Sequence, residues 1–177
     1  MKMYLTPPEI VDYTLQTGVK KANTPILAQL LLGFLAGAFI AFAAEGSNMA
    51  AFNLFAEPTT YGLGKALAGS IFGTGLMLVI VAGGELFTGN TMMLGALFEK
   101  KISLSKLLQN WIFVYIGNFI GSVFIAYMMV RSGLFNSGDS VLGAMTIKIA
   151  AYKVGLTFEQ AFFLGIMCNW LVCLAVG

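Results

Sequence analysis

The feature that most constrains this chain is a run of twenty residues without a charged side chain, Pro25 to Ala44. A helix of about 20 apolar residues is long enough to cross the hydrocarbon core of a bilayer, which is about 30 Å thick. Across the chain, 58% of the residues are hydrophobic and only 10% are charged, whereas about 25% are charged in an ordinary soluble domain. A soluble fold of 177 residues could not hide so much apolar surface. We therefore expect an all-α integral membrane protein.

Charged loops divide the chain into a short N-terminal segment and a membrane domain. Residues 1–24 contain a helix-start pattern, Thr6-Pro7-Pro8-Glu9, followed by a mixture of apolar and charged side chains. This pattern predicts an amphipathic helix that lies in the membrane interface, and a short solvated helix fits it nearly as well. Residues 25–177 form the membrane domain, with a polar loop expected directly after the first span. The expected spans are residues 25–44, 65–98, 107–130 and 161–177.

The second of these segments, Lys65 to Phe98, is too long for one straight crossing and too short for two. As a single helix it would extend roughly 51 Å, whereas two crossings need about forty residues and a turn. Glycines and polar residues cluster at positions 84–90, which read Gly-Glu-Leu-Phe-Thr-Gly-Asn. We expect two half-helices joined by an unwound stretch here, with the second half beginning near Gly89. Unwound backbone at this depth requires surrounding protein or a water-filled cavity.

The polar groups of this break have two possible uses. A half-helix that begins inside the membrane directs its unpaired N–H groups inwards and favours an anion, whereas a merely kinked helix uses its polar groups only to bind neighbouring helices. Glu85 is the only acid that the expected spans contain, and a bare carboxylate would repel an anion. We therefore expect Glu85 to accept N–H hydrogen bonds from the loop and to hold its shape, together with Gly84, Gly89 and Asn90. The Thr88 hydroxyl either contacts an ion or satisfies local backbone.

Several classes of function are excluded by what the sequence contains. The chain has no histidine, and its two cysteines, Cys168 and Cys173, lie five apart on an apolar helix without other ligand types. We therefore expect no metal site and no cofactor. No pair of nucleophile and base is present, so we assign no catalytic residue and expect no enzyme. The net charge is +2 without a basic run, so nucleic acid is not an expected partner.

The distribution of basic residues suggests an orientation. Basic side chains in short loops beside the spans mark the cytoplasmic side of a membrane protein. One side carries Lys2, Lys20, Lys21, Lys100, Lys101 and Lys106, and the other carries Lys65, Arg131, Lys148 and Lys153. We therefore expect a cytoplasmic N-terminus. The last apolar run, residues 161–176, is short for a crossing and would leave unpaired carbonyls near hydrocarbon, so we expect the natural chain to continue.

Two stretches resemble the signature of the formate/nitrite transporter family. They are residues 84–90 and residues 168–175, which read Cys-Asn-Trp-Leu-Val-Cys-Leu-Ala. Asn118, within residues 117–122, is similar to the third span of that family. The resemblance implies an aquaporin-like bundle of six spans with an inverted repeat, assembled as homopentamers with one pore per subunit. It also implies a location in the inner, or cell, membrane of a bacterium or archaeon.

The resemblance implies a function as well. Members of the family pass formate, nitrite or hydrosulfide across the lipid bilayer, so we expect a subunit of a channel for small monovalent anions. Proton-coupled transport of the same anions is the alternative, because the family's titratable histidine would lie beyond Gly177. The Thr-Gly-Asn sequence at residues 88–90 favours the nitrite and hydrosulfide branches over the formate branch.

The same resemblance assigns individual residues. Lys153 is similar to a lysine that attracts anions, whereas Lys148 has no such match. The chain departs from the family where it has Gly177 in place of an aromatic residue, and it lacks the fifth and sixth spans and the second broken helix. It would thus be truncated within the fourth span. The residues assigned to the pore or substrate path are Phe72, Leu76, Leu86, Phe87, Thr88 and Asn169.

Overall fold

The computed structural model describes residues 5–176, and within this range it contains helices and turns but no strands. Four helices are long and apolar enough to cross a membrane: α2 (Ile26–Ala56), α3 (Tyr61–Ala82), α6 (Leu104–Arg131) and α8 (Phe158–Val176). The shorter helices are α1 (Pro7–Ala22), α4 (Phe87–Asn90), α5 (Met93–Phe98), η1 (Leu134–Asn136) and α7 (Val141–Val154). The chain is a multi-pass, all-helical membrane protein, and this expectation from the sequence is confirmed.

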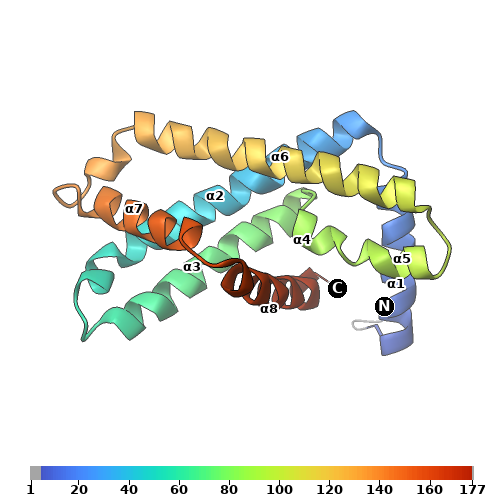
Figure 1. The fold of residues 1–177 in the computed structure, drawn as a ribbon, viewed down its shortest axis with the longest axis horizontal. Coiled ribbons are helices and arrows are strands. Elements are labelled where there is room, and N and C mark those ends of the chain that lie inside the picture. Colours follow the sequence, from blue (N-terminus) through green and yellow to red (C-terminus); the bar gives the residue numbers. More distant parts are fainter. Residues whose placement is uncertain (1–4, 177) are drawn as a thin grey trace.

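The centre of the molecule is formed by α2, which packs against both α3 and α6 (Figure 1). Helices α2 and α6 approach so closely because glycines face the contact. A Cβ atom added to Gly117 would lie 2.6 Å from the carbonyl oxygen of Leu30, and Cβ atoms on Gly37 and Gly121 would be closer still to the opposing backbone. Small residues of this kind allow the close backbone contact that stabilises helix pairs in membranes.

Helix α2 continues well past the polar loop that the sequence predicts after Ala44. Residues 45–56 are helical, so the loop predicted directly after Ala44 is wrong and the helix ends at Ala56. Glu45 and Ser47 are only 7% and 6% exposed, because α2 stays packed against neighbouring helices along this stretch. Packing therefore overrides the local polarity. The expectation that Glu85 is the only acid within an apolar span is wrong, since Glu45 lies inside α2 as well.

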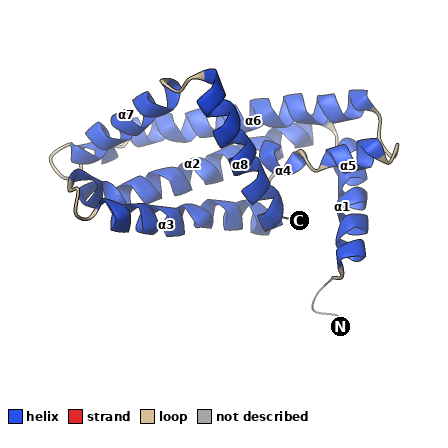
Figure 2. Ribbon diagram, turned by 60° about the horizontal axis from the view of Figure 1, so that its bottom comes forward, coloured by secondary structure: helices blue, strands red, loops and turns tan. Residues whose placement is uncertain are grey.

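Helix α1 begins at the predicted start signal. The backbone N–H of Thr6 donates to the Glu9 carboxylate at 2.7 Å, which is part of a capping box. The helix runs across the end of the long helices instead of along them (Figure 2). It is held there by a buried cluster of Ala22, Met93 and Leu107, which come from α1, α5 and α6. Its location in the membrane interface stays a prediction.

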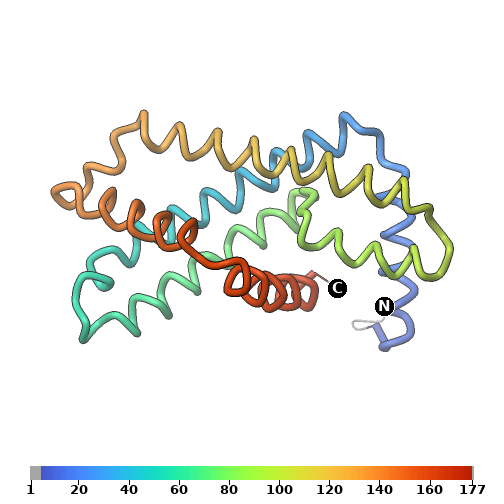
Figure 3. Tube along the Cα trace, viewed as in Figure 1, coloured from blue at the N-terminus to red at the C-terminus, as the bar shows by residue number. Residues whose placement is uncertain are grey.

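The C-terminal part of the described chain folds back over the bundle. Helix α7 packs against α2, and α8 then runs towards the break between α3 and α4 (Figure 3). Helix α8 contacts α4 but has no buried residue within the described part of the chain. The arrangement therefore places the end of α8 beside the polar residues of the second span.

Candidate functional site at the broken helix

The second span is interrupted after Ala82. Gly83 adopts the left-handed conformation with φ of +73°, which ends α3 in the manner typical of a glycine C-cap. Residues 84–86 are not helical, and Leu86 is extended. The helix resumes at Phe87 as α4, so the second half begins earlier than the predicted start near Gly89. The unwound part is therefore shorter than the predicted stretch of residues 84–90.

The Asn118 side chain on α6 explains why the helix resumes at this point. Its Oδ1 atom accepts a hydrogen bond of 2.9 Å from the N–H of Phe87. Its Nδ2 atom donates to the carbonyl oxygens of Glu85 and Gly33, both at 2.8 Å. The N–H of Glu85 donates to the carbonyl oxygen of Leu32 at 3.1 Å. Backbone groups that the break removes from the helix therefore find partners on α2 and α6, as burial in a membrane requires.

The Glu85 side chain is held by α1, which the sequence did not predict. The Lys21 ammonium group donates to Glu85 Oε2 at 2.8 Å and to Asn90 Oδ1 at 2.7 Å. Asn90 Nδ2 in turn donates to Glu85 Oε2 at 2.7 Å and to Asn110 Oδ1 at 2.8 Å. The expected N–H donors from the loop are thus replaced by two side chains. Because Lys21 offsets the negative charge, the carboxylate is not a bare charge beside the break.

The ring of Phe87, a residue predicted to line the path, packs against aromatic side chains of α6. It packs edge-on against Trp111 and Tyr115 of α6, with centroid separations of 5.8 Å and 5.5 Å. The indole N–H of Trp111 donates to the carbonyl oxygen of Asn90 at 3.0 Å. The aromatic ring therefore attaches α4 to α6 and does not face the cavity described next.

A cavity of about 300 Å³ lies beside the unwound segment, between α1, α3 and α8. Of the six residues predicted for the path, only Leu76 and Leu86 line it. All four predicted loop-scaffold residues line it too: Gly84, Glu85, Gly89 and Asn90. Phe72 does not line the cavity and is 45% exposed on α3.

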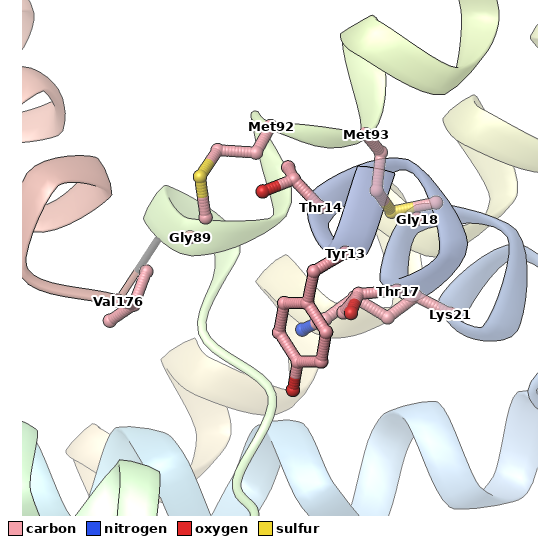
Figure 4. A pocket seen from close by; sticks show the side chains of 9 residues that line it. All are labelled: Tyr13, Thr14, Thr17, Gly18, Lys21, Gly89, Met92, Met93 and Val176. Carbon is pink, nitrogen blue, oxygen red and sulfur yellow. The ribbon is translucent and has the colours of Figure 1, made fainter. Parts of the chain in front are cut away.

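Helix α1 contributes residues to this cavity that sequence analysis missed, namely Tyr13, Thr17 and Lys21. Figure 4 shows a small adjoining space, with α1 on one side and Gly89 and Met92 on the other. Its volume is about 30 Å³, which is enough for one water molecule. These residues lie on the polar face of α1, which the sequence pattern did predict. The sequence did not indicate which element this face packs against, so they could not be assigned to the cavity.

Thr88 of α4 and Asn169 of α8 do not line the cavity, although their two helices are in contact. The Thr88 Oγ1 and Asn169 Oδ1 atoms are both buried, and neither has a hydrogen-bond partner within the described chain. On α8, the Cys173 sulfur lies 3.3 Å from Thr91 Oγ1 and 3.6 Å from the Thr88 carbonyl oxygen. Buried polar atoms are nearly always satisfied in folded proteins, so these two oxygens are candidates to contact water or a bound solute.

Lys153 is at the other end of the long helices. It lines a second cavity with two other lysines, Lys65 and Lys148, and this cavity shares no lining residue with the one beside the break. The predicted anion-attracting residue is thus separate from the predicted path residues in the described chain.

Comparison with known proteins identifies the class of protein to which the chain belongs. The sequence profile of the formate/nitrite transporter family matches residues 8–177. The chain belongs to this family, which is a family of membrane transport proteins and not of enzymes.

Relatives in three organisms cover nearly the whole chain. The formate channel BtFdhC of Bacillus thuringiensis is 41% identical over 96% of this chain and 64% of its own length. A probable formate transporter of Methanothermobacter thermautotrophicus is 38% identical over 88% of this chain and 62% of its own length. The formate channel FocA of Haemophilus influenzae is 37% identical, with 97% and 60% covered. The chain therefore spans less than two thirds of the length of these relatives.

Solved structures of channels from this family also match the chain. A pentameric formate channel with formate bound matches with a TM-score of 0.70 and 36% identity, covering 85% of this chain and 58% of that one. An ion channel of the same family matches with a TM-score of 0.73 and 26% identity, covering 96% and 67%. These relatives do not support the sequence-based preference for the nitrite and hydrosulfide branches.

Proposed function

We propose that this chain forms part of a channel for small monovalent anions, with formate as the preferred substrate. The names of its relatives support this substrate, since two of the three described above are formate channels and the third is a probable formate transporter. The similar pentameric channel that holds formate supports it further. Nitrite and hydrosulfide are of comparable size and charge, and they are the competing substrates that a flux measurement would compare.

The observation that carries the proposal is the unwound segment at residues 84–86. It faces a cavity of about 300 Å³, while its backbone is bonded from behind by Asn118 and Leu32. Non-helical backbone inside a membrane protein is tolerated where it lines such a space, and it commonly marks the path of a solute. Because the backbone hydrogen bonds of this segment are already made within the protein, the segment needs little rearrangement when an anion passes.

The wall beside the break repels an anion less strongly than the sequence suggested. A carboxylate alone would repel formate, but the Lys21 ammonium group lies 2.8 Å from Glu85 Oε2. The pair carries no net charge, so the repulsion falls off steeply with distance. Within this proposal the unpartnered Thr88 hydroxyl donates a hydrogen bond to the passing anion, and Asn169 lies next to it along the path.

The remaining path residues have narrower roles in the proposal. Leu76 and Leu86 line the cavity with apolar side chains, so we assign them to a constriction that admits a small anion and excludes larger solutes. Phe72 lies one turn before Leu76 on α3, outside the cavity, and we assign it to the path beyond this constriction. Lys153, at the far end, raises the local concentration of anions by its charge.

The proposal extends to assembly and orientation. The similarity to a pentameric channel supports a homopentamer with one path per subunit. The excess of lysines beside the short loops supports a cytoplasmic N-terminus in the cell membrane of a bacterium or archaeon.

Flux into liposomes tests the proposal. The full-length protein should conduct formate. Thr88→Val, which keeps the shape and removes the hydroxyl, should lower the rate by at least about tenfold, because a hydrogen bond to a charged group contributes about 1.5–3 kcal/mol. Thr74→Val is the matched control, because the exposed Thr74 hydroxyl bonds only within α3. Flux no greater than in empty liposomes would overturn the proposal, and uptake that collapses with an uncoupler would favour proton-coupled transport.

A further inference from the structure

A second cavity lies at the opposite end of the molecule from α1. It has a volume of about 350 Å³ and is bounded by the end of α2, the start of α3 and helix α7 (Figure 1). The lining residues are Phe55, Tyr61, Lys65, Met145, Lys148, Ile149, Tyr152 and Lys153. They combine three positive charges with three aromatic rings and two flexible or branched apolar side chains.

The positive charges of this cavity are not compensated by the described chain. Within residues 5–176 the ion pair between side chains is that of Lys21 with Glu85, so no described carboxylate lies within 4 Å of the Lys65, Lys148 or Lys153 ammonium group. Three like charges around one space repel each other, and a bound anion would offset this repulsion. The electrostatics of the cavity therefore favour an anionic ligand.

One of these charges is held in position by aromatic rings. The Lys65 nitrogen lies 5.3 Å from the ring centroid of Phe55 and 5.4 Å from that of Tyr61. The two rings are themselves in contact, with centroids 5.7 Å apart. Both distances to the nitrogen are within the range of cation–π attraction. The rings thus fix the direction of the charge and also offer apolar surface beside it.

The cavity is too large for the small anion proposed for the broken helix. An anion of three heavy atoms takes roughly the space of two or three water molecules, about 60–90 Å³. A cavity of about 350 Å³ has room for a ligand several times larger, and sites of this size commonly hold organic molecules between apolar walls. Met145, Ile149 and Tyr152 supply such a wall on the α7 side.

We propose that this cavity binds a monocarboxylate that carries an aromatic ring, such as an arylcarboxylate. The carboxylate lies among Lys65, Lys148 and Lys153, and the ring packs against Phe55, Tyr61 and Tyr152. The cavity shares no lining residue with the one beside the break. Lys153 is the lining residue that the proposed function also uses, and the variants that test the binding are therefore at Lys65, Lys148 and Tyr61.

Calorimetric titration of the full-length protein in phosphatidylcholine nanodiscs tests the proposal, with benzoate as the probe. We expect benzoate to bind at least tenfold more tightly than formate and than cyclohexylmethanol, which lacks the charge. Lys65→Gln and Lys148→Gln should each weaken benzoate binding about fivefold or more. Lys101→Gln, which removes an exposed charge from the loop before α6, should leave it unchanged.

Tyr61→Leu separates the aromatic contribution from the charge. It should weaken benzoate binding severalfold and leave the weak binding of formate as it was. Equal binding of benzoate and formate would overturn the proposal, and so would equal losses for Lys65→Gln and Lys101→Gln. Displacement of benzoate by phosphatidylglycerol in the nanodisc would assign the cavity to a lipid phosphate instead and would also overturn it. Because binding is measured without a gradient, its outcome is independent of whether the protein conducts formate.

Discussion

Replacing Asn118 with leucine removes the side chain that joins the two sides of the broken helix. The substitution conserves approximate volume but deletes three hydrogen bonds, to the Phe87 N–H and to the carbonyl oxygens of Glu85 and Gly33. The Phe87 N–H and the Glu85 carbonyl are then left without a partner, whereas the Gly33 carbonyl keeps its hydrogen bond within α2. The leucine methyl groups cannot replace either the donor or the acceptor.

The expected loss of stability follows from these three bonds. A buried backbone group left unsatisfied costs about 1–3 kcal/mol, whereas hydrogen bonds between membrane helices average about 0.6 kcal/mol when measured in double-mutant cycles. Three bonds at the lower value and two unsatisfied groups at the higher value set a range from about 2 kcal/mol to about 6 kcal/mol. We expect a value of about 3–5 kcal/mol for Asn118→Leu, since Glu85 lines the neighbouring cavity and its freed carbonyl can reach water there.

Reversible unfolding of the purified protein in mixed micelles measures this loss. Asn53→Leu is the matched control, because Asn53 is exposed on α2 and makes no described hydrogen bond, so its unfolding free energy should change by less than about 0.5 kcal/mol. Limited proteolysis should cut Asn118→Leu faster at residues 83–87 than it cuts the unaltered protein. A loss below about 1 kcal/mol for Asn118→Leu would refute the assignment of Asn118 as the residue that holds the break.

Two other substitutions have definite expected outcomes. Lys21→Met leaves the Glu85 carboxylate in place without its cation. It should lower the unfolding free energy by about 2–4 kcal/mol, less than for a fully buried pair because both side chains keep some exposure. Lys20→Met, on the exposed side of α1, should have little effect in the same unfolding measurement in mixed micelles. Gly37→Ala places a methyl group against the α6 backbone and should abolish most of the folded protein seen by size-exclusion chromatography, whereas Gly62→Ala, which has open space around it, should yield a normal elution profile.

The position of the break could be predicted from the sequence because it is a local property. Gly83 and Gly84 end a helix whether or not anything surrounds them, and polar residues inside an apolar segment have few alternatives to an unwound stretch. The start of α1 at the capping sequence is local in the same sense. The exact restart at Phe87 was not predictable, because the cap that fixes it comes from Asn118, which lies 31 residues further along the chain.

The contacts that give the site its character depend on how the helices pack. Lys21 and Glu85 are 64 residues apart, and no periodicity in either segment indicates that α1 crosses the end of the bundle there. Phe87 was assigned to the path from its place in the motif, and the motif does not indicate that its ring packs against Trp111 and Tyr115 of α6. A motif gives residue identity and approximate depth, while the direction of each side chain is decided by the neighbouring helix.

The two sides of the broken segment therefore have different roles, one in stability and one in the proposed transport. On the side facing α2 and α6, the backbone groups and the Asn90 and Phe87 side chains are bonded or packed, so substitutions there should change stability before they change selectivity. On the side facing the cavity, the polar lining consists of Tyr13, Thr17 and the Lys21–Glu85–Asn90 network, whose charges offset one another. The Thr88 hydroxyl on α4 has no partner within the described chain. A solute that passes the break can form a hydrogen bond with Thr88 without breaking one within the protein, and this makes Thr88 the residue at which transport and stability should be most separable.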